Sequence, residues 1–343
     1  MKKTFIIAFL LFGCSSIEFP WDKVTLDNAI NNYEKPIMVY FFATWWGPCK
    51  TLEASTFKDD DVIELAKQNF INLKIDAETK YGQPLFENFQ GTGYPLIIFL
   101  DSNGNELDRF YGSLPPYEFI IKMNNVLDGK GTFTYYLDEY NKNNHSAEIL
   151  TSLAKKYQEK GDFDNSLIIY QELLQTSNIS KTHFEDAKYN IGILSINHNN
   201  LMPIKEFLTN YPEYENIEDA VYALLNFYKS YQMESKEIDL YTQYLNQFRD
   251  SYSFLNSYAW RMAELNKNLN NALSTINKAL KLINKNRPEY PNILNTKAEV
   301  LWKLGKNDKA IKTINTAIDM EPSSDYYKTQ KDKFITRKGS LSH

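Results

Sequence analysis

Cysteine, histidine, glycine and proline are all scarce in this chain of 343 residues, and each shortage excludes a class of protein. Two cysteines are too few to stabilise a disulfide-rich scaffold or to provide the ligands of a multi-cysteine zinc site. The four histidines are scattered without the spacing of ligands, so we expect no metal site and no cofactor. The 13 glycines and 12 prolines lie well below the ordinary combined share of about 12 %. Few helix-breaking residues predict a largely helical chain.

Charge of one sign is also lacking, because 38 basic residues face 43 acidic ones and the formal net charge is −5. Such a balance gives no electrostatic reason to expect a nucleic acid as partner. What the chain does have is apolar and aromatic material, including 24 Tyr, 21 Phe and 5 Trp. This is enough to build hydrophobic cores, and the length favours two domains.

The N-terminus has the features of an export signal over residues 1–13. Lys2 and Lys3 precede an apolar run of roughly eight residues, whereas a membrane span needs about 20. The sequence Leu-Phe-Gly before Cys14 resembles a bacterial lipobox, although Phe12 replaces the usual small residue. The resemblance implies a lipid on Cys14, a tether over 14–20, and an exported protein anchored to a bacterial membrane and facing the periplasm. The alternative is a plain secretory signal with a chance cysteine.

Residues 21–130 alternate between strand and helix patterns. Two apolar runs of strand length, 36–43 and 95–100, are typical of buried strands, residues 70–76 alternate as a further strand, and a Ser-Asn-Gly-Asn turn at 102–105 leads into a fourth. The expected strands are 36–43, 70–76, 95–100 and 106–111, and the expected helices are 25–33, 49 onward, 81–89 and 115–127. This order predicts an α/β domain with a central mixed sheet flanked by helices.

The loop after the first expected strand reads Ala-Thr-Trp-Trp-Gly-Pro-Cys-Lys over residues 43–50 and resembles the thioredoxin superfamily, whose motif is Trp-Cys-Gly-Pro-Cys-Lys. Asp76 at a strand end agrees with this resemblance, and Gly93-Tyr94-Pro95 is similar to the cis-proline loop of the family. The residues after the motif are similar to the periplasmic, disulfide-reducing branch. The resemblance therefore implies a thioredoxin-like fold descended from a thiol–disulfide oxidoreductase.

The chain departs from the family at its reactive position, because Trp46 stands where the family has its attacking cysteine. Thiol–disulfide exchange needs an exposed thiolate and a second thiol that resolves the mixed disulfide. Cys49 corresponds to the resolving thiol, and Tyr40 and Asn72 correspond to the family's buried acid and its accompanying lysine. Exchange between two thiols of this domain is therefore excluded. The expected binding groove consists of Trp45, Trp46, Gly47, Pro48, Tyr94 and Pro95.

Alternatives stay open at both positions of the motif. Trp46 is a residue that drifted after function was lost, a new aromatic contact in the old substrate groove, or an isolated change in an active lineage. Cys49 is a buried small hydrophobe or a vestigial redox thiol that forms mixed disulfides with a partner.

The second half of the chain has the periodicity of helical repeats. We expect a polar linker over 131–144, repeats over 145–336 and a tail over 337–343. The clearest unit spans 294–322 and resembles a tetratricopeptide repeat in its small residues, turn glycine and terminal proline: Ala298, Gly305, Ala310, Ala317 and Pro322. An earlier unit over about 153–170 and one before the clearest unit are similar, whereas 187–208 and 221–245 are degenerate. About five helical pairs are expected, and stacked pairs commonly hold a protein partner.

The sequence favours a non-catalytic, membrane-anchored protein that binds or assembles polypeptides. The competing hypothesis is a thioredoxin-type oxidoreductase in cell redox homeostasis that uses Cys49 with a thiol of its partner. A third is a structural spacer that binds no partner.

Overall fold

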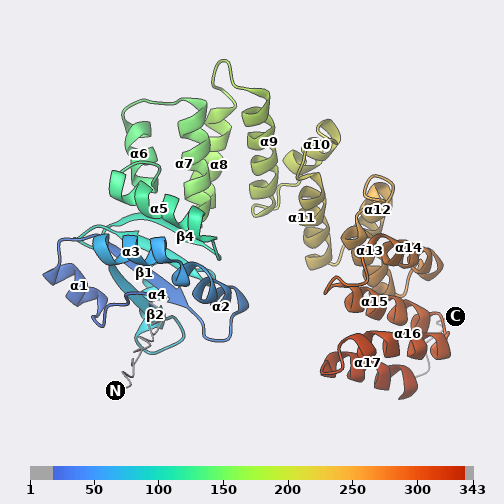
Figure 1. The fold of residues 1–343 in the computed structure, drawn as a ribbon. Helices are drawn as coiled ribbons and strands as arrows, with labels where there is room; N and C mark the ends of the chain where they lie inside the picture. Colours follow the sequence, from blue (N-terminus) through green and yellow to red (C-terminus); the bar gives the residue numbers. More distant parts are fainter. Residues whose placement is uncertain (1–17, 337–343) are drawn as a thin grey trace, which may run out of the picture. The chain divides into compact units, whose positions relative to one another are not determined.

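The computed structural model describes residues 18–336, which divide into two compact units between Tyr211 and Pro212. The first unit holds a four-stranded sheet with its helices and five further helices (Figure 1). All regular elements described in the second unit are helices. The expected signal, Cys14 and the expected tail lie outside the described residues.

A mixed sheet forms the centre of the first unit, as the sequence predicts. Its order is β2-β1-β3-β4, with β1 and β2 parallel and the other neighbours antiparallel. Each expected strand is present within one residue of its predicted limits. The strands are β1 (Ile37–Phe42), β2 (Ile71–Asp76), β3 (Leu96–Leu100) and β4 (Glu106–Tyr111).

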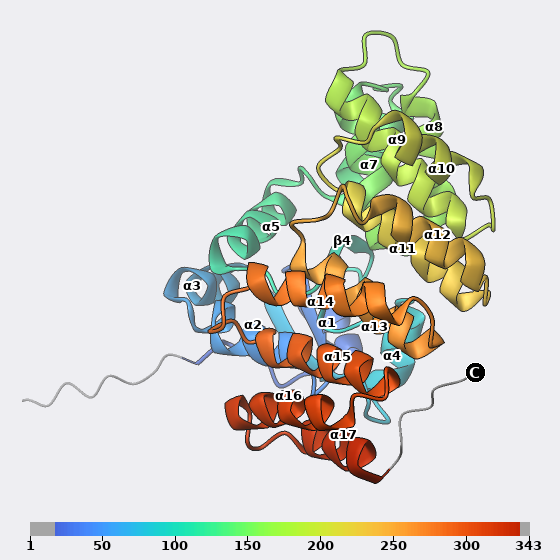
Figure 2. The ribbon, with the colours of Figure 1, turned by 90° about the vertical axis from the view of Figure 1, so that its right-hand side faces the viewer.

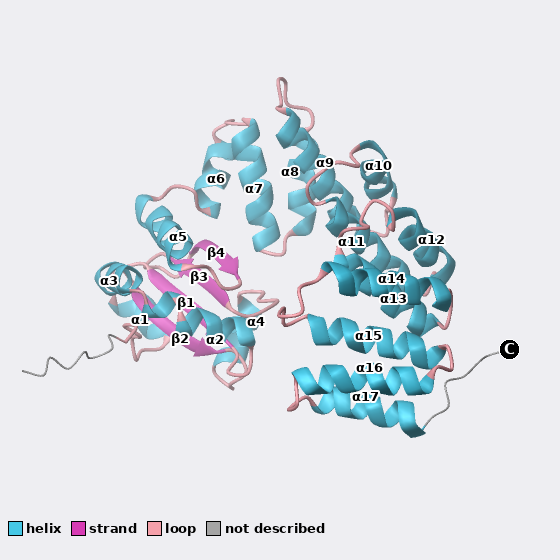
Figure 3. Cartoon of the chain, turned by 45° about the vertical axis from the view of Figure 1, so that its right-hand side comes forward, coloured by secondary structure: helices cyan, strands magenta, loops and turns pink. Residues whose placement is uncertain are grey.

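Helices cover both faces of this sheet (Figure 3). Met38 and Tyr40 of β1 face the core beneath α3 (Asp60–Asn69) and α5 (Pro116–Asp128). The alternate residues of β1 face a second core with α1 (Leu26–Asn32) and α4 (Gly82–Asn88). Burial on both faces explains why the strands read as continuous apolar runs. The fold is completed by α2 (Gly47–Ala54) and the short 3₁₀ helix η1 (Thr56–Lys58).

The fold of the first unit begins before residue 21, within the segment expected as a tether. Phe19 is buried, and its ring lies 4.3 Å from that of Trp21 and 4.5 Å from that of Phe57. This aromatic cluster fixes the chain against the core, so the described part of 14–20 packs as part of the domain.

The segment 131–144, expected as a linker, contains helix α6 (Phe133–Asn141). Thr132 caps it by accepting a hydrogen bond from the backbone N–H of Tyr135. The backbone N–H of Phe133 donates to Asp108 of β4 at 3.3 Å, and half-buried aromatic rings of α6 pack against α7–α9. Residues 133–141 of the segment expected as a polar linker therefore form a helix, which packs along the edge strand of the sheet.

Antiparallel helices follow α6, and the described residues contain the five successive pairs that the periodicity predicts, with one further helix after them. Gly305 takes φ +71° at the turn between α15 and α16, a conformation that favours glycine, and Pro322 follows the end of α16. In the first unit the helices are α7 (Ala147–Glu159), α8 (Phe163–Leu173), α9 (Lys181–Ile196) and α10 (Met202–Asn210). In the second unit they are α11 (Ile217–Ser230), α12 (Glu234–Tyr244), α13 (Tyr252–Leu265), α14 (Leu269–Leu282), α15 (Tyr290–Lys303), α16 (Asn307–Met320) and α17 (Asp325–Thr336).

Candidate functional site

The loop that joins β1 to α2 carries two neighbouring tryptophans at the surface. Trp46 is the N-cap residue of α2 and is 40 % exposed, and the exposed ring of Trp45 meets it edge to face at 5.3 Å between centroids. Gly47 and Pro48 open the helix, and a Cβ added at Gly47 would meet nothing within 4 Å. The start of α2 is therefore open to an approaching chain.

Cys49 lies in the first turn of α2 and is 1 % exposed. The Tyr40 hydroxyl donates to Glu53 Oε1 at 3.1 Å and lies 3.5 Å from the backbone carbonyl oxygen of Cys49. Glu53 in turn pairs with Lys74 at 3.0 Å. Burial, together with nearby negative charge, raises the pKa of Tyr40, so its hydroxyl stays protonated. The surroundings of this sulfur are packed and closed to solvent.

Tyr94 and Pro95 lie in the loop that precedes β3, and the peptide bond between them is cis. The Tyr94 ring packs at 5.0 Å from the ring of Phe86 in α4, and the Pro95 carbonyl accepts a hydrogen bond from Gly112. Burial and then the charges of Glu78 and Asp76 raise the pKa of Tyr94. The pKa of Tyr94 is therefore sensitive to the charge of Asp76, at the end of β2, and to that of Glu78 after it.

Glu78 links the tryptophan loop to this tyrosine, and sequence reasoning missed it. The indole Nε1 of Trp45 donates to both carboxylate oxygens of Glu78, at 2.9 and 3.0 Å. Glu78 thus binds Trp45 directly and acts on Tyr94 through its charge, while the ring of Trp46 lies against that of Trp45. We call Trp45, Trp46 and Tyr94 the aromatic surface. The only signal in the sequence was that Glu78 follows the strand ending at Asp76.

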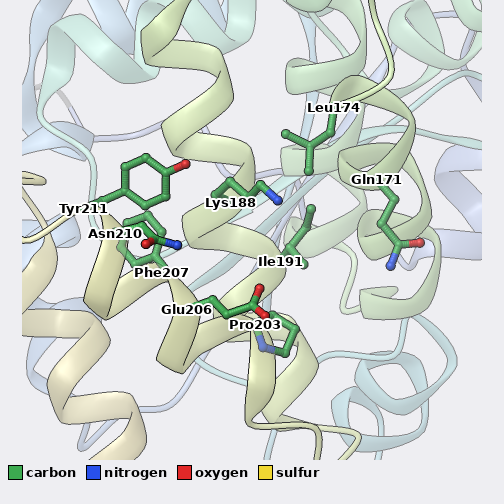
Figure 4. A pocket seen from close by; sticks show the side chains of 9 residues that line it. All are labelled: Gln171, Leu174, Lys188, Ile191, Pro203, Glu206, Phe207, Asn210 and Tyr211. Carbon is green, nitrogen blue, oxygen red and sulfur yellow. The ribbon is translucent and has the colours of Figure 1, made fainter.

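A pocket of about 270 Å³ lies among α8, α9 and α10 of the first unit (Figure 4). Apolar side chains line much of it, and Lys188 and Glu206 come to it from neighbouring helices. The lining residues are Gln171, Leu174, Lys188, Ile191, Pro203, Glu206, Phe207, Asn210 and Tyr211. An apolar pocket bordered by groups of both charges fits an amphipathic partner such as a polypeptide side chain.

Neither metal ligation nor membrane spanning is evident in residues 18–336. Within this range no cluster of three or more His, Cys, Asp or Glu side chains has the arrangement of a metal site. None of the helices there combines the length and the apolar character that a transmembrane segment requires.

Comparison with known proteins agrees with this geometry. Residues 23–127 match the thioredoxin-like domain family, and residues 291–324 match the tetratricopeptide repeat family. The chain thus carries a thioredoxin-like domain followed by a tetratricopeptide repeat within a helical array.

The relatives of the N-terminal part are thioredoxin-like proteins. Over 131 residues the chain is 32 % identical to the thioredoxin-like protein HCF164, chloroplastic, of Arabidopsis thaliana, covering 38 % of this chain and 49 % of that protein. Over 95 residues it is 33 % identical to the thiol:disulfide interchange protein DsbD of Yersinia pestis, covering 27 % of this chain and 16 % of that protein. The solution structure of a thioredoxin from Thermus thermophilus is 23 % identical in sequence, with a TM-score of 0.30. The match covers 32 % of this chain and 88 % of that thioredoxin. The chain spans about half or less of the length of these two curated relatives.

Proposed function

We propose that this protein is exported, anchored to a membrane by lipid on Cys14, and binds polypeptides without catalysing thiol–disulfide exchange. The observation that carries the proposal is the pair of residues at the start of α2. Trp46 occupies the N-cap, where an attacking thiolate would be stabilised by open backbone N–H groups, and the described thiol, Cys49, is 1 % exposed. A buried single thiol lacks both the access and the partner that exchange needs.

Two surfaces of the first unit support polypeptide binding. Within the aromatic surface, Trp45 and Trp46 present exposed rings at the open start of α2, and aromatic side chains are enriched among residues that dominate binding energy. The pocket among α8, α9 and α10 offers an apolar site bordered by Lys188 and Glu206. Tetratricopeptide repeats also favour a protein as partner.

The alternative function is a thioredoxin-type oxidoreductase that uses Cys49 with a thiol of its partner. It is favoured by the curated relatives, one of which is a thiol:disulfide interchange protein. It requires local opening of α2, because the sulfur is buried in the folded chain.

Truncation of Trp46 tests the binding proposal. We expect Trp46→Ala to weaken binding of an unfolded polypeptide with blocked thiols, such as carboxymethylated α-lactalbumin, by about 1–2 kcal/mol. The melting temperature should change little, since the ring is 40 % exposed. Binding is measured by titration calorimetry with the full chain.

Tyr117→Ala is the matched control, because Tyr117 is an exposed aromatic residue on α5, outside the aromatic surface. It should bind like the unmodified protein. A lower melting temperature for Trp46→Ala, with unchanged affinity per folded molecule, would assign Trp46 to the core and refute binding at this surface.

Replacement of Cys14 tests the anchor. We expect Cys14→Ser to move the protein from the membrane fraction to the soluble fraction, or to leave its signal uncleaved, because the diacylated residue is lost. Fractionation and intact-mass analysis measure both effects. Normal processing together with full membrane association of the variant would show that Cys14 is not the anchor.

A further inference from the structure

A polar pocket of about 340 Å³ lies in the second unit, where it is lined from α13, α15 and α17, helices of successive repeats. The helices α14 to α17 stack one after another in Figure 2. The pocket is lined by Asn256, Ser257, Trp260, Asn292, Asn295, Thr296 and Tyr326. Nothing in the repeat pattern of the sequence pointed to it.

The lining of this pocket has an unusual chemical composition. Among the described residues that line it, none carries a charge and none has a purely aliphatic side chain. Three carboxamides and three hydroxyl groups, which both donate and accept hydrogen bonds, stand beside an indole ring. A charged ligand would therefore be desolvated there without a counter-charge, and an apolar side chain would find no aliphatic surface.

Asn295 is the buried part of the site, since only 1 % of it is exposed. Its Nδ2 donates to the Tyr326 hydroxyl at 3.3 Å, while its Oδ1 has no hydrogen-bond partner among the described residues. The carboxamide oxygen of Asn256 also has none. An unpaired buried acceptor is costly, so both amides favour a ligand that brings hydrogen-bond donors. Rotation about the broad χ2 well of asparagine lets either end of the carboxamide face that ligand.

Trp260 supplies the apolar part of the site. Its indole Nε1 already donates to Glu264 Oε1 at 2.9 Å, which leaves the ring as the part available to a ligand. Tyr326 adds an exposed ring from α17. Aromatic rings next to groups that both donate and accept hydrogen bonds match a molecule with C–H faces and many hydroxyl groups.

We propose that this pocket binds a neutral saccharide, with C–H groups against Trp260 and hydroxyl groups on the three asparagine carboxamides. An uncharged peptide is the competing ligand class, because its backbone could use the same amides. The lining favours the saccharide, since a peptide would also present side chains that find no aliphatic contact. This inference is independent of the function proposed for the thioredoxin-like domain.

Titration calorimetry of the full chain with four neutral trisaccharides tests the proposal: cellotriose, maltotriose, mannotriose and chitotriose. We expect at least one to bind with a Kd of about 1 mM or tighter. Asn292→Ala should weaken that binding about fivefold or more, because one carboxamide is lost from the pocket. Asn292 is exposed and its side chain makes no hydrogen bond with the described residues, so this variant should fold normally.

Asn88→Ala is the matched control, because Asn88 is also an exposed asparagine and stands at the end of α4 in the first unit, outside both pockets. It should bind the saccharide like the unmodified protein. The proposal is overturned if none of the four trisaccharides binds at a concentration of about 10 mM, ten times the expected Kd, or if Asn292→Ala binds as tightly as Asn88→Ala. It is equally overturned if the uncharged hexapeptide Gly-Ser-Asn-Gly-Ser-Asn binds in their place and loses affinity in Asn292→Ala.

Discussion

Replacing Lys156 by methionine should destabilise the packing of α7 on the sheet by about 3–5 kcal/mol, the cost of breaking a buried ion pair. Lys156 Nζ lies 2.6 and 2.7 Å from the two carboxylate oxygens of Asp108 on β4, and 2.9 Å from Glu159. The side chain of Lys156 is only 7 % exposed and that of Asp108 only 1 %. Without Lys156, the Asp108 carboxylate stays buried with its main counter-charge removed.

The charges around Lys156 define the pH range over which its ion pair with Asp108 stabilises the fold. Burial alone would lower the pKa of Lys156, but the charges of Asp108 and Glu159 outweigh it and raise the pKa. A raised lysine pKa stabilises the fold at pH values below the unfolded pKa of about 10.4. The stabilisation of the fold by Lys156 should therefore be complete at neutral pH, and it should be lost as the pH rises through the pKa that Lys156 has in the folded state.

Native-state hydrogen exchange of α7 and β4 amides measures this loss, with Lys142→Met as the control. Lys142 pairs with Asp138 at 2.5 Å and with Glu139 at 3.3 Å, but the lysine is exposed, so its loss should cost less than about 1 kcal/mol. Burial raises the pKa of Asp108 despite its partner, so removing both charges in Asp108→Asn with Lys156→Met should recover much of the loss. An equal, small effect of Lys156→Met and Lys142→Met would contradict a structural role for the pair.

The second large effect is a gain of redox activity in Trp46→Cys. The new thiol would stand at the N-cap of α2, three residues before Cys49, where open backbone N–H groups and the helix dipole stabilise a thiolate. We expect a disulfide between positions 46 and 49 and a rate of insulin reduction about tenfold or more above that of the unmodified protein, equivalent to about 1.4 kcal/mol of barrier. Mass analysis after alkylation detects the disulfide.

Trp45→Cys is the matched control for this gain. It adds a thiol to the same loop, one residue before the N-cap, so it should leave insulin reduction at background. If Trp46→Cys forms no disulfide and gains no more activity than Trp45→Cys, the residue at position 46 is not the sole reason why the loop lacks redox activity.

The strands of the first unit could be predicted because burial on both faces leaves an unbroken apolar run such as residues 37–42. Helix α6 was missed although Phe133, Tyr136, Leu137 and Tyr140 stand at helical spacing, because these side chains are only half-buried and the residues around them are polar or glycine. Its packing partners are β4 and the helices α7 to α9, which the fold brings against it. The sequence pattern alone therefore did not distinguish this helix from the linker expected over 131–144.

The residues of the candidate site were predictable where the motif is continuous and not where contacts cross the fold. Trp45 and Trp46 stand in the motif, but Glu78 meets Trp45 from 33 residues away. The degenerate repeats bury large residues such as Phe207 and Tyr241, and the small residues that mark the clearest unit are fewer there. The saccharide pocket depends on residues from three helices that only the fold brings together.

The rate at which the unmodified full chain reduces insulin disulfides in the presence of dithiothreitol tests the central claim most directly. The claim is that the chain binds polypeptides through a thioredoxin-like domain that lacks exchange chemistry, because Trp46 provides no sulfur and Cys49 is buried. It predicts a rate equal to that of dithiothreitol alone and equal to that of Cys49→Ser. A rate clearly above this background that Cys49→Ser abolishes would contradict the claim and establish Cys49 as a working redox thiol.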